Sequence, residues 1–399
     1  MSDTSNRAPT TATAAAPQHS LAPIYAANMV CSMGMMGFVA AAGPLAASLG
    51  LEAWQIGLSA TAGGLGWVLA ARFWGKTADR TGRKPVLLVG LSGFIAGYFL
   101  LCLGVVAGVR WEVPALYVLG VLVATRFGMG LSYSAVPAAG AAVIADRFAP
   151  DDRAGAMGRL GAAQASGLLF GPAAVALLAG ESPATVLFLL ALLPIPALAF
   201  AAIALPKDAP KAAAATGQLP LGDARLIRPV LVAMLAMMAV GIAQIVIGFV
   251  AMDRLSLPES SAMRLAGGAL AAVGVSLVVA QLTVRRLGWP PAALMRVGSG
   301  MAALGLLAAA FAPSEVTLVL SYAFSGFGAG WAFPGINAYA ANAVSSEEQG
   351  RAAGAVSSAM GVGAMLGPTI GGAFYQQSGA ASYLIAAAVF AAAALIVRK

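Results

Sequence analysis

Residues 86–109 read VLLVGLSGFIAGYFLLCLGVVAGV, an apolar stretch that contains no charged residue. A helix needs about 20 consecutive apolar residues to cross the hydrocarbon core of a bilayer, which is ~30 Å thick. The stretch exceeds that length, and the polar sequence TGRK at 81–84 and Arg110 close it on either side. It therefore predicts a transmembrane helix.

Comparable stretches recur through the rest of the chain. Of its 399 residues, 60% are hydrophobic and 10% are charged, against roughly 25% charged in an average soluble domain; the mean hydropathy is +0.86. This composition excludes an ordinary soluble enzyme and predicts an all-α integral membrane protein with twelve transmembrane helices. The expected spans are 21–49, 54–75, 86–109, 114–140, 156–180, 184–204, 229–252, 262–284, 291–312, 315–340, 351–375 and 379–397.

The formal net charge of +8 comes from 23 Lys and Arg against 15 Asp and Glu, a balance that suits either a nucleic acid or a membrane surface. The basic residues lie in short connections between apolar stretches, which is typical of topology signals at a bilayer. On one side of the membrane the connections hold only Arg110, Arg254 and Arg264. The positive-inside rule then predicts a multi-pass protein of the cell (inner or plasma) membrane with both termini cytoplasmic.

The chain is expected to divide into two halves. Residues 1–20 are rich in Ala, Thr and Pro and predict a disordered cytoplasmic tail. Residues 205–228 form the longest break between apolar stretches and predict a cytoplasmic linker. The linker would join six-helix bundles over 21–204 and 229–399.

The two halves also share a pattern. At an offset of about 196 residues, the glycines and the proline of the fifth span fall on equivalent residues of the eleventh span. Many transporters are built from internal repeats of this kind, with the substrate site between the halves near the bilayer midplane. The fold class expected is therefore two six-helix pseudo-repeats.

Between the second and third spans, residues 75–84 read GKTADRTGRK. This segment resembles the loop signature G-x-L-A-D-R-x-G-R-K of the major facilitator superfamily, with Thr77 in place of the usual Leu. Its glycines permit a tight turn and close approach to a neighbour, and its basic side chains hold the loop at the cytoplasmic surface; the alternative is a merely positive short loop. The latch expected here consists of Gly75, Asp79, Arg80, Gly82, Arg83, Lys84 and Asp146.

Two contacts are expected of this latch. The resemblance implies that Asp79 meets the start of the eleventh span, where Ser346 and Gln349 have the spacing of a capping box and the positive helix end would favour a carboxylate. Arg83 is expected to pair with Asp146 at the cytoplasmic end of the fourth span. The hypothesis is that these contacts lock the halves together in one state of a transport cycle.

Arg126 lies about a dozen residues into the fourth span, which holds no acidic residue to neutralise it. A charge at this depth costs several kcal/mol unless it faces water or a partner. With Leu122, Met129 and Gly130, Arg126 resembles the signature L-x-x-x-R-x-x-Q-G of the same superfamily, Met129 replacing Gln. The resemblance implies a role in proton coupling; the alternative is an arginine that donates to carbonyl groups of a neighbouring helix.

The fifth span matches the first part of G-x-x-x-G-P-x-x-G-G, a signature associated with the antiporter branch of the superfamily, but Val175 and Ala176 replace its last two glycines. The eleventh span carries the full pattern. Small residues four apart let helices approach closely and proline bends a span, so helix packing and rocking are the expected roles, with ordinary close packing as the alternative. The residues concerned are Gly167, Gly171, Pro172, Gly363, Gly367 and Pro368.

Spans one, four, seven and ten line the cavity in this superfamily, so the resemblance points to their polar and aromatic residues as substrate contacts; helix packing is the alternative for each. Methionines in the first and seventh spans add soft, adaptable surface and favour a large, mostly neutral or zwitterionic amphiphile. The expected cavity residues are Asn28, Ser32, Phe38, Ser132, Tyr133, Gln244, Phe249, Tyr322, Trp331, Phe333 and Asn337.

Acidic residues are placed differently from what proton coupling usually requires. All 15 can be assigned to connections or span ends, so no carboxylate is plainly a mid-membrane proton carrier. Asp253, near the outer end of the seventh span, is the nearest substitute, and a solvated span end is the alternative. The only histidine, His19, lies in the tail and no phosphate-binding G-x-x-x-x-G-K-[ST] loop is present, so no enzymatic activity, nucleotide, metal or cofactor is expected.

These observations predict a secondary active transporter that exports a small amphiphilic compound, such as a drug, a siderophore or another metabolite, by alternating access in exchange for protons. Its partners would be the small-molecule substrate, protons and the lipid bilayer, with no nucleic acid, and it would act as a monomer. An importer or facilitator on the same fold is the nearest alternative. A transporter-like membrane receptor or scaffold is the alternative from another class.

Overall fold

The computed structural model describes residues 20–111, 113–148, 150–206, 223–345 and 348–397. The expected tail over 1–20 lies outside this part of the chain except for Ser20, and the expected linker over 205–228 is described only at its two ends.

The described residues form fourteen helices and no strand. They are α1 (Ala22–Ser48), α2 (Ala53–Thr81), α3 (Arg83–Arg110), α4 (Ala115–Tyr133), α5 (Ala135–Arg147), α6 (Pro150–Leu177), α7 (Pro183–Leu192), α8 (Pro194–Ala204), α9 (Ile227–Asp253), α10 (Glu259–Leu287), α11 (Pro291–Ala310), α12 (Glu315–Asn342), α13 (Gln349–Tyr375) and α14 (Gly379–Ile396). Because α4 continues into α5 and α7 into α8, they make 12 spans that are long and apolar enough to cross a membrane, which confirms the expected number.

Proline accounts for both interruptions. Pro137 lies at the start of α5 and Pro194 begins α8. Proline has no N–H to continue the helical ladder, and its ring clashes with the carbonyl one turn earlier. The fourth and sixth spans therefore bend at Ser134 and Leu193 without leaving the bundle.

The second span corrects one expectation. It was expected to end at residue 75, but α2 continues to Thr81, so Gly75 lies inside a helix and does not form a turn. The chain reverses at Gly82, whose φ of 96° is one that side-chain-bearing residues rarely adopt. The helix continues because Ala78 is fully buried and Arg80 in the last turn suits the negative helix end.

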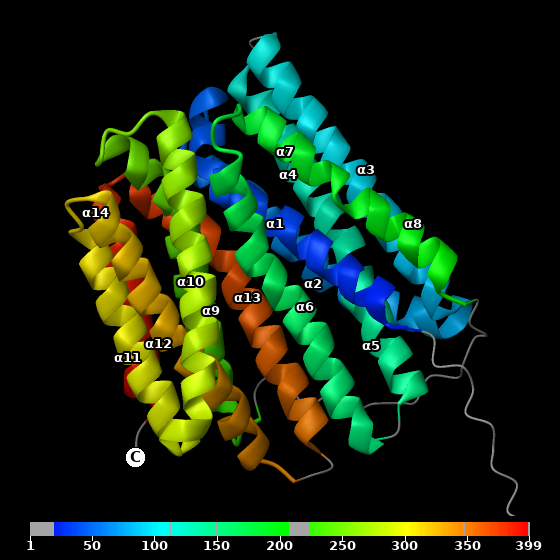
Figure 1. Ribbon diagram of the computed structural model, residues 1–399. Helices are drawn as coiled ribbons and strands as arrows, with labels where there is room; N and C mark the ends of the chain where they lie inside the picture. Colours follow the sequence, from blue (N-terminus) through cyan, green and yellow to red (C-terminus); the bar gives the residue numbers. More distant parts are fainter. Residues whose placement is uncertain (1–19, 112, 149, 207–222, 346–347, 398–399) are drawn as a thin grey trace, which may run out of the picture.

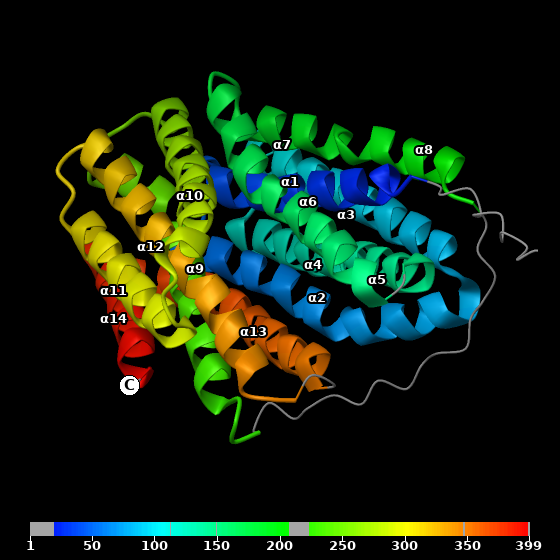
Figure 2. The same cartoon turned by 60° about the horizontal axis from the view of Figure 1, so that its bottom comes forward.

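The two halves lie side by side, with α3, α7 and α8 at the right of Figures 1 and 2 and α11, α12 and α14 at the left. Outer helices carry large apolar side chains that are mostly exposed, among them Leu103, Leu304 and Leu395. Such a surface would aggregate in water. In a bilayer it is the face that contacts lipid.

Candidate functional site

Both described termini lie at one end of the bundle, together with Arg83 and Arg225; we call this the basic end, and the other the opposite end. The halves meet through α1, α2 and α6 from one half and α9, α10 and α13 from the other. In span order these are the first, second and fifth spans of each half, so the contact surface follows the internal repeat.

Close backbone contacts between the halves lie toward the opposite end. A Cβ placed on Gly267 of α10 would lie 2.5 Å from the Pro172 carbonyl oxygen of α6, and one placed on Gly57 of α2 would overlap the Pro368 carbonyl oxygen of α13. Both pairs join equivalent spans of the repeat, because each sets the second span of one half against the fifth span of the other. Only glycine allows helices to approach this closely, so the contacts close the opposite end.

Polar bonds reinforce this closure. Thr61 Oγ1 of α2 donates to the Met365 carbonyl at 2.5 Å and receives a bond from Thr369 Oγ1 at 2.8 Å, both residues in α13. At the surface, the Gln376 amide donates to the Glu52 carboxylate, which also accepts from Trp54 Nε1 at 2.6 Å. Each bond between the halves must break if the opposite end opens.

The contact between α2 and α13 follows an antiparallel register. Gly57 faces Pro368, Gly64 faces Met365, and Val68 lies 3.6 Å from a Cβ placed on Gly361. Continued about two turns from Val68 toward the basic end, the same register pairs Gly75 with Gly354. Nothing, however, lies within 4 Å of a Cβ placed on either glycine. The two helix faces therefore separate toward the basic end.

Arg83 organises the turn between α2 and α3. Its side chain is only 7% exposed and forms ion pairs of 3.0 Å with both Asp79 and Asp146, and it also donates to the Ala78 carbonyl. The expected pairing of Arg83 with Asp146 is thus present. All of these partners belong to the N-terminal half.

The other latch residues lie close by. Lys84 Nζ donates to the carbonyls of Ala202, at 2.7 Å, and Leu205, at 2.5 Å, and so ties α3 to the end of α8, whereas Arg80 is exposed. The expected capping box is wrong, because α13 begins at Gln349, so Gln349 is the first helical residue and cannot be the third; Ser346 lies outside the described residues. Among the described residues of α13, none forms an ion pair with Asp79.

We expect Arg83→Ala to lower the thermal unfolding midpoint, because it removes a buried donor that binds two carboxylates and a carbonyl. Hydrogen bonds to charged groups contribute about 1.5–3 kcal/mol each, and the part-exposed carboxylates reduce the loss to about 2 kcal/mol in all. The measurement is heating of detergent-solubilised protein followed by size-exclusion chromatography. Lys76→Ala, an exposed position in the same turn, is the control; equal midpoints for both variants would contradict the assignment.

Arg126 is 2% exposed near the middle of the fourth span. Its Nη1 donates to Met35 Sδ at 3.2 Å and its guanidinium lies 4.3 Å from the centre of the Phe38 ring. Its Nε has no hydrogen-bond partner among the described residues. The guanidinium is therefore buried among apolar and weakly polar groups, with no carboxylate bound to it.

The expected cavity residues fall into two groups. Asn28, Ser32, Phe38, Tyr133, Phe249 and Tyr322 are buried within their own halves; Ser132 is half-buried but lies against Gly93 of α3. Gln244, Trp331, Phe333 and Asn337 are half-buried or exposed. Only this second group and Ser132 thus keep exposed surface in this conformation.

Methionines occupy equivalent places in the central helices. The glycines of α6 lie against the Met29 and Met33 carbonyls of α1, and those of α13 against the Met234 and Met238 carbonyls of α9. These four methionine residues are partly exposed although α1 and α9 are the two most buried spans. Because α1 and α9 pack against each other and against helices of both halves, these side chains are the candidates for lining the space between the halves.

The glycine and proline residues of α6 and α13 explain how each of these helices contacts both halves. A Cβ on Gly171 would lie 2.5 Å from the Met33 carbonyl oxygen, and one on Gly367 would lie 2.5 Å from that of Met238. The same helices carry Pro172 and Pro368 across to the other half. Each of α6 and α13 thus packs within one half and touches the other.

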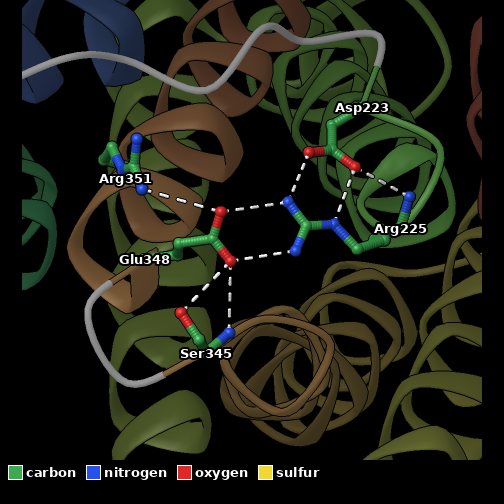
Figure 3. Close-up of polar contacts among 5 residues, drawn as sticks. All are labelled: Asp223, Arg225, Ser345, Glu348 and Arg351. Carbon is green, nitrogen blue, oxygen red and sulfur yellow. Dashed lines mark hydrogen bonds and ion pairs between the residues drawn. The ribbon is translucent and has the colours of Figure 1, made fainter.

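A cluster at the basic end was missed in the sequence. Arg225 Nη1 and Nη2 donate to both Glu348 oxygens, at 2.9 and 3.1 Å, and Arg225 also binds Asp223 at 2.9 Å (Figure 3). Glu348 further accepts bonds from Ser345 and lies 3.6 Å from Arg351. The cluster joins the chain before α9 to the start of α13, a pairing over 123 positions that no local pattern reveals.

The Arg225 guanidinium and the Ser345 backbone amide lower the pKa of Glu348 to about 2. A depressed carboxyl pKa means that this ion pair is fully formed above the ordinary pKa of Glu and is lost only as the pH falls through about 2. We therefore expect the difference in unfolding midpoint between the wild type and Glu348→Gln to stay constant from pH 5 to pH 8. A difference that shrinks as the pH falls across that range would contradict the assignment.

Asp253 ends α9 at the opposite end. Its Oδ2 accepts a bond from Tyr375 Oη at 2.7 Å, and the neighbouring Arg254 donates to the Ala309 and Ala310 carbonyls at 2.8 and 2.6 Å. Asp253 is exposed. A separate groove of about 390 Å³ between α3 and α7, lined by residues such as Phe99, Leu103 and Phe188, faces lipid and lies away from the contact between the halves.

Comparison with known proteins decides the family. The model of the Major Facilitator Superfamily matches residues 24–314 and 231–398. The chain belongs to the Major Facilitator Superfamily. This major facilitator protein is a multi-pass membrane transporter and not an enzyme.

Its sequence relatives match over a short stretch. The tetracycline resistance protein, class D, of Salmonella ordonez is 38% identical over 109 residues, which are 27% of this chain and 24% of that protein. A probable triacylglyceride transporter of Mycobacterium bovis is 34% identical over 108 residues, 27% of this chain and 19% of that protein. The match thus spans a quarter or less of these relatives.

Solved structures match over nearly the whole fold. The nucleoside transporter NupG superposes with a TM-score of 0.76 at 14% identity, covering 94% of this chain and 97% of that one. The human organic anion transporter MFSD10 (TETRAN) gives 0.65 at 20% identity, covering 96% and 100%. At these identities the likeness shows that this major facilitator protein shares their fold.

Proposed function

We propose that this transporter exports a small amphiphilic compound by alternating access, in exchange for protons. The observation that carries the proposal is the one-sided contact between the halves: α2 and α13 touch from Gly57 to Val68, and the same faces separate toward Gly75 and Gly354. For a substrate to pass between the two halves, their contact surface must be closed at one end while it is open at the other.

We assign the orientation in the membrane from the distribution of basic residues. Arg83, Arg153, Arg225 and Arg285 lie at the basic end, which the positive-inside rule places in the cytoplasm. In that orientation the structure is closed to the outside and open between α2 and α13 toward the cytoplasm. This is the state in which an exporter takes up its substrate.

The latch residues fit the same cycle. When the basic end closes, the register of α2 and α13 brings Gly75 against Gly354, next to the turn that Arg83 holds. Two glycines at that point allow the backbones to meet as they do at Gly57. We assign Gly75, Gly82 and Arg83 to this closure, with Asp79, Arg80, Lys84 and Asp146 shaping the turn.

An amphiphilic substrate is supported by the half-exposed methionines of α1 and α9, which offer a soft apolar surface without fixed charge. The names of the relatives agree, because tetracycline and triacylglycerides both carry large apolar parts. Proton exchange is assigned to Arg126 and, at the opposite end, to Asp253.

A facilitator or importer is the second candidate, and one observation favours it. Every described Asp and Glu lies at a helix terminus or in a connection, so none is placed as a proton carrier within the membrane.

The experiment uses inverted membrane vesicles that are made acidic inside and contain a pH-sensitive dye. Tetracyclines, lipophilic dyes and siderophores are added one at a time, and the internal pH and the uptake of labelled compound are followed together. Export in exchange for protons predicts alkalinisation with uptake for at least one compound, absent from vesicles without the protein. Uptake that proceeds equally without a proton gradient would replace the exporter by the facilitator.

A further inference from the structure

Arg126 has a charge for which the described residues supply no counterion. The guanidinium lies between α1, α2 and α4, bound to Met35 Sδ at 3.2 Å and stacked on the Phe38 ring at 4.3 Å. Among the described residues its Nε has no hydrogen-bond partner, and the buried Asn28 Oδ1, about two turns from Met35 on α1, has none either. A buried cation of this kind lowers stability unless water, a carbonyl group or an anion compensates its charge.

The described acidic residues cannot provide that compensation. All of them lie at helix termini or in connections, and those nearest in sequence on the neighbouring helices are Glu52, Asp79 and Asp146 at the helix ends. Asp79 and Asp146 are already paired with Arg83. The interior of the described spans therefore has a positive charge and no negative one.

The Met35 sulfur that contacts the guanidinium can be displaced by a change of side-chain rotamer. Met35 has an unbranched, flexible side chain that is half-buried, on the most buried span. Gly63 borders the same point, because a Cβ placed there would lie 3.5 Å from both the Met35 methyl carbon and Arg126 Nη2. A rotation of the Met35 side chain would uncover the guanidinium Nη1 and Nη2 groups next to Gly63, a position with no side chain of its own.

We propose that the ligand of this site is an acidic amphiphile, whose carboxylate or equivalent oxyanion binds Arg126 in the place of Met35 Sδ while its apolar part lies along the methionines of α1 and α9. The inference rests on the proposed function and narrows its substrate class from amphiphiles in general to amphiphilic organic anions. Guanidinium and carboxylate form two parallel charge-assisted bonds, which are stronger than the thioether contact that they replace. A small inorganic anion shares this chemistry and is separated from the organic anion by the test.

The test compares an amphiphilic carboxylic acid with its own methyl ester, which has the same apolar part and no charge. Binding to purified protein in nanodiscs is measured by the shift in unfolding midpoint, with 10 mM chloride or with gluconate as the only other anion. The wild type is expected to bind the acid about tenfold or more tightly than the ester, from the ordinary strength of hydrogen bonds to charged groups. Equal affinities for acid and ester would overturn the inference and leave the proposed function standing.

Two variants separate the site from a general effect. Met35→Glu supplies a carboxylate beside Arg126, so it should raise the unfolding midpoint, abolish the preference for the acid and keep binding of the ester. Arg126→Gln should also abolish the preference, whereas Arg110→Gln, at an exposed arginine, should keep it. Persistence of the preference in Met35→Glu would refute the site, protection by chloride alone would assign it to an inorganic ion, and failure of every variant and ligand to bind would contradict the proposed function itself.

Discussion

Replacing Gly267 with leucine should move this transporter out of the conformation described above and stop transport. A Cβ at this position would lie 2.5 Å from the Pro172 carbonyl oxygen and 2.7 Å from the Ala176 amide nitrogen, so the added side chain must push α10 away from α6. Overpacking of this kind costs about 1–3 kcal/mol, which is roughly a 5- to 150-fold change in the population closed at the opposite end.

The neighbouring glycine is the matched control. Gly268 lies in the same helix, and nothing is within 4 Å of a Cβ placed on it, so Gly268→Leu should transport normally. The readout is labelling of Ser357→Cys by an impermeant thiol reagent, since Ser357 is exposed on α13 toward the basic end and the two native cysteines are buried. Labelling should fall in Gly267→Leu and not in Gly268→Leu; equal labelling would show that this contact does not hold the opposite end closed.

Replacing Arg126 with glutamine should abolish transport and at the same time stabilise the protein. A buried arginine at the centre of a span costs about 2.5–3.5 kcal/mol, and its bonds to Met35 and Phe38 compensate only part of that cost. Residues that function requires often lower stability in this way. The loss of transport and the rise in unfolding midpoint are expected in the same preparation.

The two measurements are substrate-driven proton movement in vesicles and thermal unfolding in detergent. A structural role for Arg126, as an arginine that merely joins helices, predicts the reverse pattern: a lower midpoint and transport in proportion to the protein that remains folded. That pattern would remove Arg126 from both the coupling and the substrate-binding assignments.

Hydropathy predicted the spans well because bilayer thickness sets their length. Most boundaries fell within a few residues. The main exceptions are α2, which continues past residue 75 to Thr81, and the fourth span, which continues past residue 140 to Arg147. A polar helix can project from the membrane when one face stays buried. Helix faces were harder to predict. Ser132 was expected in the cavity but lies against α3, since spans rich in small apolar residues show little difference between their faces.

Contacts between distant parts of the chain were not predictable from one sequence. The register that sets Gly57 against Pro368 and Gly267 against Pro172 joins the two halves. Within the second half, Arg225 binds Glu348, which lies 123 positions further along the chain. The Arg83–Asp146 pair was anticipated only because the 75–84 segment resembles a known signature. Local patterns therefore predicted the turn that Arg83 holds, and the structure was needed to show at which end of the bundle the two halves are in contact.

The most direct measurement is cross-linking of Gly75→Cys with Gly354→Cys in the full-length protein, with Gly75→Cys alone as control. Neither position has a neighbour within 4 Å of its Cβ here, so both should tolerate the change. Alternating access predicts slow cross-linking at rest, a severalfold increase when substrate and a proton gradient drive the cycle, and arrest of transport once the link has formed. Two outcomes would contradict closure of the basic end during transport. In one, the two cysteines never cross-link while transport proceeds; in the other, the fully cross-linked protein transports normally.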